Sequence, residues 1–256
     1  ENTTVFDQNT QNLIDSAFEK FAPINSSAGA MPASEFEFVR VGTLECRPPD
    51  FLIEGLIETE TLSLMFGDPG CGKSFLAVDV ALSVASGTSF HGRTVKQGPV
   101  FFIAGEGHQG LVRRFHAWSK DRNVSLEDIQ LFKSERAAQF LDAASAQAVA
   151  NAVQDLAIEC GPPALIIVDT LARNFGSGDE NSTRDMSDFV AAIDDLKAQF
   201  SGCTLLIVHH TGHADKQRAR GAMALKGALD SEYRVHKEEQ SGRILLTCTK
   251  MKDAEP

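Results

Sequence analysis

A short segment in the first third of the chain has the residue types and spacing of a phosphate-binding loop. It reads Gly67-Asp68-Pro69-Gly70-Cys71-Gly72-Lys73-Ser74 and matches the pattern G-x-x-x-x-G-K-[ST]. Glycines allow the backbone to curl until several N–H groups converge on one anion. Lys73 can then contact the β- and γ-phosphates, and the Ser74 hydroxyl can ligate a Mg²⁺ ion that bridges phosphate oxygens. The segment, with Phe75 directly after it, predicts a nucleotide site that takes ATP and Mg²⁺.

Two carboxylates further along the chain have positions that suit ATP hydrolysis. Asp169 follows the apolar run 164–168 (ALIIV), an arrangement that places one carboxylate beside Mg²⁺. The next residue is Thr170 rather than a second acid, so the base that activates water must come from elsewhere. Glu106 ends the apolar segment 99–105, and we expect that strand to lie beside the phosphate-loop strand. Its carboxylate would then sit over the γ-phosphate and activate water.

The pattern of apolar residues predicts the elements that carry these side chains. Predicted strands cover residues 61–66, 99–104, 164–168, 203–208 and 243–249, and predicted helices cover 73–86, 111–120, 145–159 (with Ser145 as its N-cap) and 182–200. Most of the strands are almost entirely apolar, as strands covered on both faces are. Strands interleaved with helices favour an α/β fold with a mainly parallel central sheet flanked by helices. Ligands of such sheets bind at the carboxyl ends of the strands.

Composition and charge restrict the class of protein. The chain has 256 residues, of which 43% are hydrophobic, enough for one large domain with its own core. A net charge of -11 means that the surface as a whole does not attract nucleic acid or an anionic membrane, so any DNA contact needs a local basic patch or a channel in an oligomer. The five scattered cysteines fit a reducing cytoplasm. With no signal-peptide pattern and no apolar run of membrane length, we expect a cytoplasmic protein without a membrane partner.

The first 34 residues differ from the rest of the chain. Residues 11–21 carry an apolar stripe at helical spacing, and residues 23–34 (PINSSAGAMPAS) have the small, polar, proline-containing composition of a linker. We therefore predict an N-terminal arm or short helix with a linker over residues 1–34, and one ATPase domain over residues 35–256. The arm is either flexible or docks on a neighbouring subunit.

Four segments together resemble the RecA-fold ATPases. They are the phosphate loop, a glutamate that ends the following strand (IAGEG), a strand that ends in Asp-Thr (LIIVDTLAR) and a strand that ends in His-His (LLIVHHTG). More narrowly, the chain resembles the RepA-type replicative helicases of plasmids and phages, distant relatives of DnaB, over roughly residues 50–253. The resemblance implies a RecA-like P-loop NTPase core that assembles as a hexameric ring and uses ATP hydrolysis to move along single-stranded DNA.

The resemblance also implies roles for individual residues. Glu106 matches the catalytic glutamate, and His210 matches the strand-end residue that contacts the γ-phosphate and couples it to DNA loops. The segment that follows His210 matches a DNA-facing loop, which in a ring would form a basic collar for phosphates. The candidate DNA contacts are Lys216, Arg218, Arg220 and Lys226.

A second group of cations matches residues that act across a subunit boundary. Lys250-Met251-Lys252 lies where ring helicases of this type carry K-x-R, whose cations reach the nucleotide of the neighbouring subunit. Lys252 can neutralise charge but cannot form the bidentate contacts of arginine, so Arg220 and Arg243 are further candidates for this trans-acting finger. The acidic, glycine-rich segment 174–181 (NFGSGDEN) fits a subunit contact or a mobile loop.

Two other functions are compatible with the same residues. A RecA-like ATPase could coat DNA or load onto it without unwinding, and a strand-displacement assay separates that function from a motor. A nucleotide-gated regulatory module without a DNA partner would agree with the net charge of -11. Stimulation of ATP turnover by single-stranded DNA separates the regulatory module from both DNA-binding functions.

Overall fold

The described part of the chain comprises residues 38–45, 48–212, 219–221 and 223–252 of a computed structural model. The chain divides into two units, residues 1–47 and 48–256. The described residues of the first unit contain one 3-10 turn, η1 (Val41–Thr43), and the predicted arm at 1–34 lies outside the described residues. The second unit carries the phosphate loop.

A seven-stranded sheet organises the second unit. Its order is β5-β4-β6-β7-β3-β8-β9, and its strands pair in parallel except for the antiparallel pair β8 and β9. The strands are β3 (Leu62–Gly67), β4 (Val100–Ala104), β5 (Leu131–Lys133), β6 (Leu165–Asp169), β7 (Thr204–His210), β8 (Ser231–Lys237) and β9 (Ile244–Met251), and β1 (Phe51–Ile53) with β2 (Ile57–Glu58) forms a separate two-stranded sheet. Parallel pairing brings the carboxyl ends of β3, β4, β6 and β7 to one edge of the sheet, where the predicted catalytic residues lie.

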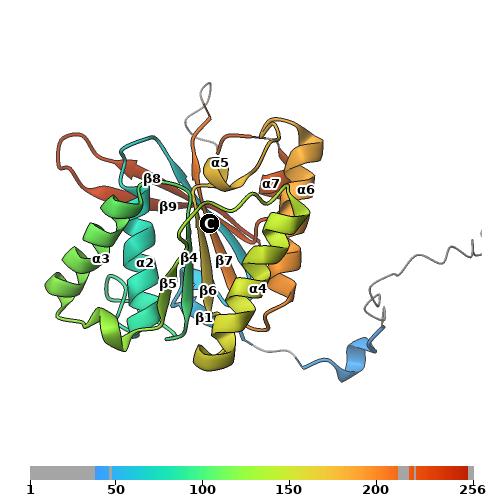
Figure 1. Cartoon of the computed structure of the whole chain (residues 1–256), viewed down its shortest axis with the longest axis horizontal. Coiled ribbons are helices and arrows are strands. Elements are labelled where there is room, and N and C mark those ends of the chain that lie inside the picture. The colour runs from blue at the N-terminus through green and yellow to red at the C-terminus, as the bar shows by residue number, and fades with distance from the viewer. Residues whose placement is uncertain (1–37, 46–47, 213–218, 222, 253–256) are drawn as a thin grey trace, which may run out of the picture. The chain divides into compact units, whose positions relative to one another are not determined.

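Helices cover both faces of the sheet (Figure 1). On one face lie α2 (Lys73–Ser86) and α3 (His108–Arg122), and on the other lie α4 (Ala143–Cys160), α6 (Thr183–Ala198) and α7 (Met223–Ala228). The short helix α5 (Leu171–Asn174) follows β6, and the 3-10 turn η2 (Leu126–Asp128) precedes β5. This arrangement confirms the predicted α/β fold with a mainly parallel sheet flanked by helices.

Alternate residues of the central strands enter two separate cores. In β7, Leu206 and Val208 belong to the core that includes α2, whereas Leu205 and Ile207 belong to the core that includes α6. Because successive side chains of a strand point to opposite faces, a strand covered on both faces is apolar at every position. Burying each such side chain contributes about 1.5–3 kcal/mol. The apolar runs in the sequence therefore reflect burial on two faces.

The order of the strands corrects one expectation from the sequence. We expected the strand before Glu106 to lie beside the phosphate-loop strand, but β6 and β7 separate β4 from β3. The neighbour of β3 on that side is β7, with Gly67 opposite His210. Apolar patterning cannot distinguish these orders, since the strands concerned are buried on both faces. Glu106 approaches the site because it lies at the same carboxyl edge, not because its strand is adjacent to β3.

The start of α4 also differs from the prediction. Asp142, not Ser145, is the N-cap residue, and its side chain accepts a hydrogen bond from the Ser145 backbone N–H at 2.9 Å. The Ser145 hydroxyl instead accepts a hydrogen bond from the Gln139 N–H at 3.0 Å. The sequence did not predict β1, β2, β5, β8, α5 or α7, which are short or carry charged residues. Among the described residues, no helix has the length and apolar composition that crossing a membrane requires.

Candidate functional site

The predicted phosphate loop connects the end of β3 to the start of α2. Gly67 is the last residue of β3, and Lys73 is the first residue of α2. Gly72 lies between them with a φ of 105°, in the left-handed region where a side chain causes strain, and a Cβ on it would lie 2.4 Å from Ile244 Cδ1. The free N–H groups and the positive end of the α2 dipole face this loop. The loop therefore has the backbone shape that an anion site at a helix N-terminus requires.

Lys73 is held at the centre of the loop. Only 5% of the residue is exposed, and its Nζ donates hydrogen bonds of 2.8 Å to the carbonyl oxygens of Gly67 and Asp68. Burial lowers the pKa of Lys73, while the neighbouring Cys71 and Asp169 raise it. Two backbone carbonyls thus fix the ammonium group where a phosphate in the loop would meet it.

Asp169, the last residue of β6, supplies a buried carboxylate beside the loop. Burial raises the pKa of this carboxyl group, and the Ser74 side chain and the charges of Lys73 and Arg114 lower it. Its Oδ1 is buried without a hydrogen-bond partner among the described residues. Mg²⁺ binds oxygen ligands, and a serine hydroxyl next to an unpartnered carboxylate oxygen supplies two of them. Ser74 and Asp169 therefore fit the predicted Mg²⁺ site.

Glu106 lies after β4 at the same edge of the sheet and is paired with an arginine. The distance between Arg173 Nε and Glu106 Oε2 is 2.8 Å, and the two side chains are 62% and 53% exposed. Burial is the main cause of the raised pKa of Asp169 and of the lowered pKa of His210, and the charge of Glu106 adds to the first effect and opposes the second. The predicted base is thus near the predicted metal ligand, and Arg173 of α5 holds it. No local pattern in the sequence indicated this pair.

Two histidines at the end of β7 have different environments. His209 is fully buried, its Nε2 donates to the Arg220 carbonyl oxygen at 2.9 Å, and burial lowers its pKa to about 3. His210 is half-buried, and its pKa is lowered by burial and then by the charge of Lys73. The Nδ1 atom of His210 has no hydrogen-bond partner among the described residues. A neutral imidazole of this kind can hydrogen-bond a phosphate. His213 lies outside the described residues.

The end of β7 is hydrogen-bonded directly to the phosphate loop. The Thr211 N–H donates to the Gly67 carbonyl oxygen at 3.2 Å, and the Thr211 hydroxyl donates to Asp68 Oδ1 at 2.6 Å. On the other side, the His210 carbonyl oxygen accepts a hydrogen bond from the Arg220 N–H at 2.9 Å. Sequence reasoning did not single out Thr211, because its role depends on β7 lying next to β3.

The predicted DNA contacts that the structure describes are both paired with glutamates. Arg220 Nε lies 3.4 Å from Glu180 Oε2, and Lys226 Nζ lies 3.0 Å from Glu232 Oε2. Lys216 and Arg218 lie outside the described residues. Intramolecular ion pairs therefore neutralise the two described cations.

The two lysines of the predicted trans-acting finger lie at the edge of the sheet opposite the phosphate loop, whereas the alternative candidate Arg220 lies at the end of β7. Lys250 Nζ donates to the Leu229 carbonyl oxygen just after α7, and Lys252 Nζ is 3.1 Å from Asp230 Oδ1. The Asp230 N–H in turn donates to the carbonyl oxygen of Leu62, the first residue of β3. Lys250 and Lys252 are thus separated from their own loop by the length of a strand.

Three cations that the sequence did not indicate, Arg114, Arg234 and Lys237, lie on the two sides of the loop. A cavity of about 560 Å³ on the β8 side is lined by loop residues 68–71 and by Arg234 and Lys237. On the α3 side, Phe75 is 58% exposed. The Arg114 guanidinium carbon lies 4.3 Å from the centroid of its ring. Arg114 also acts on the pKa of Asp169, so it is within electrostatic range of the predicted metal ligand.

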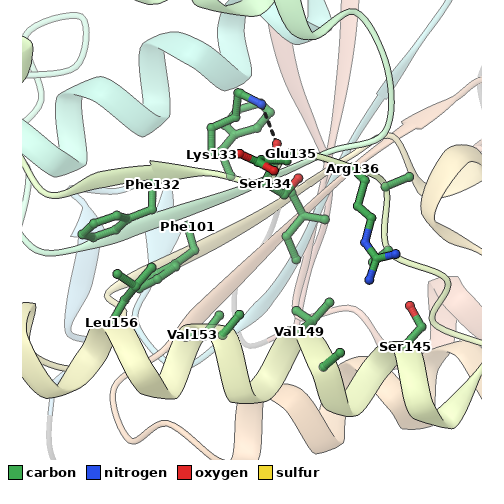
Figure 2. Close-up of a pocket in the computed structure, with 16 residues that line it drawn as sticks. Phe101, Phe132, Lys133, Ser134, Glu135, Arg136, Ser145, Val149, Val153 and Leu156 are labelled. Carbon is green, nitrogen blue, oxygen red and sulfur yellow. Dashed lines mark hydrogen bonds between the residues drawn. The ribbon is translucent and has the colours of Figure 1, made fainter.

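A second cavity, of about 520 Å³, opens between β4, β5 and α4 (Figure 2). The rings of Phe101 and Phe132 stack on its sheet side with centroids 5.1 Å apart, and Val149 and Leu156 of α4 face them. Its strands are separated from β3 by β6 and β7. The mainly apolar lining does not suit a triphosphate, whereas the loop after β3 offers backbone N–H groups and a buried lysine.

The fold and the loop define the class of protein. A glycine-rich turn between a parallel strand and a helix, with a buried lysine and a strand-end aspartate beside it, is the site of the P-loop nucleotide-binding proteins. The chain matches the family model described as AAA domain over residues 30–216, which is more than half of its 256 residues. It therefore belongs to the AAA domain family and is a P-loop ATPase domain. A comparison with curated proteins gave no match.

Proposed function

We propose that this ATPase is a motor that acts on single-stranded DNA as a ring-shaped hexamer, in the manner of a replicative helicase. The proposal rests on the hydrogen bonds that join the end of β7 to the phosphate loop and to Arg220. His210, the predicted γ-phosphate contact, is next to Thr211, which is hydrogen-bonded to the phosphate loop. The same strand end pairs with Ala219 and Arg220, at the far side of the segment predicted to face DNA. A change at the γ-phosphate would therefore act on both ends of that segment.

In the proposed reaction, the triphosphate of ATP lies in the loop at residues 67–74. The loop N–H groups and Lys73 bind the β- and γ-phosphates, and Ser74 and Asp169 would hold Mg²⁺, which neutralises charge on the phosphate oxygens. Glu106 orients the attacking water and accepts its proton. His210 hydrogen-bonds the γ-phosphate and loses that partner after hydrolysis.

The contact between Glu106 and Arg173 is weak enough to allow this role. Both side chains are more than half exposed. Exposed ion pairs contribute only about 0–1 kcal/mol, so water and nucleotide can compete with Arg173 for the carboxylate. In the proposed cycle, Arg173 keeps the base at the edge of the site and releases it when nucleotide binds.

The position of the predicted finger supports an assembly of several subunits. Lys250 and Lys252 lie beside the start of β3, whereas the phosphate loop follows its end. Within one chain these cations are remote from the phosphate loop, so any contact between them and a nucleotide would require a neighbouring subunit. A chain of net charge -11 needs a local basic surface to bind DNA, and a ring would bring together the copies of the segment predicted to face DNA.

ATP turnover with and without single-stranded DNA at low salt tests the proposal. Lys73→Ala should lower turnover by at least about 10²-fold because the phosphates lose their cation, whereas Lys120→Ala on exposed α3 should not. DNA-stimulated turnover together with displacement of a tailed duplex is the expected result. Stimulation without displacement would identify a coating or loading ATPase. Turnover that single-stranded DNA does not change would overturn the DNA proposal and favour a regulatory module.

A further inference from the structure

Glu180 is an acidic residue with an incompletely satisfied carboxylate. It lies between α5 and α6, in the acidic segment that the sequence left without a mechanism. Its side chain is only 11% exposed, and its Oε2 atom has no hydrogen-bond partner among the described residues. Burial raises the pKa of this carboxyl group, the charge of Arg220 lowers it, and Asp179 raises it. The fold therefore keeps a buried negative charge that the charge of one arginine, Arg220, stabilises.

The cation beside Glu180 is the predicted DNA contact Arg220. Arg220 Nε lies 3.4 Å from Glu180 Oε2, and His209 Nε2 lies 3.8 Å from the same oxygen. Because burial lowers the pKa of His209 to about 3, that ring is neutral and Arg220 carries the positive charge. The distance of 3.4 Å is longer than a good charge-assisted hydrogen bond, so the pair is close but not optimally bonded.

Hydrogen bonds fix the backbone of Arg220, whereas its partly exposed side chain can pair either with Glu180 or with a group from solvent. Its N–H donates to the His210 carbonyl oxygen and its carbonyl oxygen accepts from His209, each at 2.9 Å. Its side chain is 37% exposed, so one side of the guanidinium is open to solvent. By contrast, Glu232 Oε2 also accepts a hydrogen bond of 2.8 Å from Thr249, and it keeps that partner when Lys226 leaves. Of the two described pairs, the Arg220 pair is therefore the one whose release leaves a buried carboxylate without its nearby cation.

We propose that Glu180 limits the affinity for single-stranded DNA by holding the Arg220 guanidinium, which a DNA phosphate must take over on binding. The inference rests on the proposed function, since it assigns a regulator to the same DNA surface. It gives the acidic segment a role: its carboxylate competes with phosphate for one cation. DNA then binds only when enough phosphate contacts form together to outweigh the internal pair.

Binding of a fluorescently labelled oligothymidine strand, measured by anisotropy at low salt, tests the inference. Glu180→Gln should lower the Kd about three- to fivefold, the effect of releasing one partly exposed pair. Asp179→Asn is the matched control: it makes the same change of charge one residue away, and the Asp179 carboxylate accepts from Asn181 rather than from Arg220. Glu180→Asp keeps the charge but draws it back from Arg220, and should also lower the Kd, by less than Glu180→Gln. Urea unfolding confirms that each variant is folded.

The same titrations separate the two proposals. In an Arg220→Ala background, Glu180→Gln should have no larger effect than Asp179→Asn. If the wild-type chain binds DNA but Glu180→Gln and Asp179→Asn shift the Kd equally, or if the gain persists without Arg220, the inference about Glu180 is wrong and the motor proposal stands. If neither the wild-type chain nor any variant binds, the DNA proposal itself fails, and the inference with it.

Discussion

Replacing Asp169 by asparagine should make the protein more stable and much less active. Asp169 is 9% exposed, and its Oδ1 atom has no hydrogen-bond partner among the described residues. Burial raises its pKa above 3.8 despite the opposing effects of Ser74 and Lys73. The surroundings therefore disfavour the ionised form, and Asp169→Asn replaces that form by a neutral group of the same shape.

The size and the pH dependence of the stability change follow from this environment. Burial of the charge is the cost that Asp169→Asn removes, so the variant should raise the free energy of unfolding at pH 7 by about 1.4 kcal/mol for each unit by which the fold raises the pKa of Asp169. The folded chain binds the Asp169 proton more tightly than the unfolded chain does, so ionisation destabilises the fold above the folded pKa. The advantage of the variant should therefore be present at pH 7 and disappear as the pH falls through the raised pKa of Asp169.

Urea unfolding in a chelating buffer without nucleotide measures this effect, and ATP turnover with Mg²⁺ measures the functional loss. Turnover should fall by at least about 10²-fold, because the amide is a poor ligand for a hard cation. Asp50→Asn is the control, since Lys96 lowers the pKa of this exposed carboxyl group and its removal should not stabilise the fold. A variant at position 169 that is less stable than the wild type would show that the carboxylate is a structural partner of Lys73 and that burial of its charge does not destabilise the fold.

Three further changes test the site. Glu106→Gln should retain ATP binding but lower turnover about 10²- to 10⁴-fold, because an amide cannot accept a proton from water; unchanged phosphate release would place the base elsewhere. Gly72→Ala should lower the free energy of unfolding in urea by about 1–3 kcal/mol and weaken nucleotide binding, because a φ of 105° strains a residue with a Cβ. The control Gly110→Ala lies within α3 and should raise the free energy of unfolding. His209→Gln should flatten the pH dependence of stability. Below pH 6.5 the His209 ring of the unfolded wild type is protonated, whereas the buried ring of the folded chain, with a pKa of about 3, stays neutral. The wild type should therefore lose about 1.4 kcal/mol of stability per pH unit. If the urea midpoint shifts by the same amount between pH 7 and pH 5 in the wild type and in the variant, His209 is not the cause of the pH dependence.

The sequence alone determined the elements whose signals are local. The bounds of α2 agree with the predicted helix at 73–86, because a glycine turn precedes it and Gly87 follows it. The strands β3, β4, β6 and β7 were recognisable because each is apolar along its length, a direct record of burial on both faces. The phosphate loop was evident because its chemistry needs glycines, a lysine and a hydroxyl at fixed spacing. The class of P-loop ATPase, which the family match confirms, rests on these local patterns.

Which elements are neighbours is a property of the folded chain that the sequence did not reveal. Strands with the same apolar composition do not reveal their order, so the position of β7 between β6 and β3 could not be predicted. That order makes Thr211 a partner of the phosphate loop. The pairs of Glu106 with Arg173 and of Glu180 with Arg220 join residues from different segments, and each partner alone looks like an ordinary surface charge. A sequence shows which groups can do chemistry, whereas the charges that hold or release them are set by contacts between segments far apart along the chain.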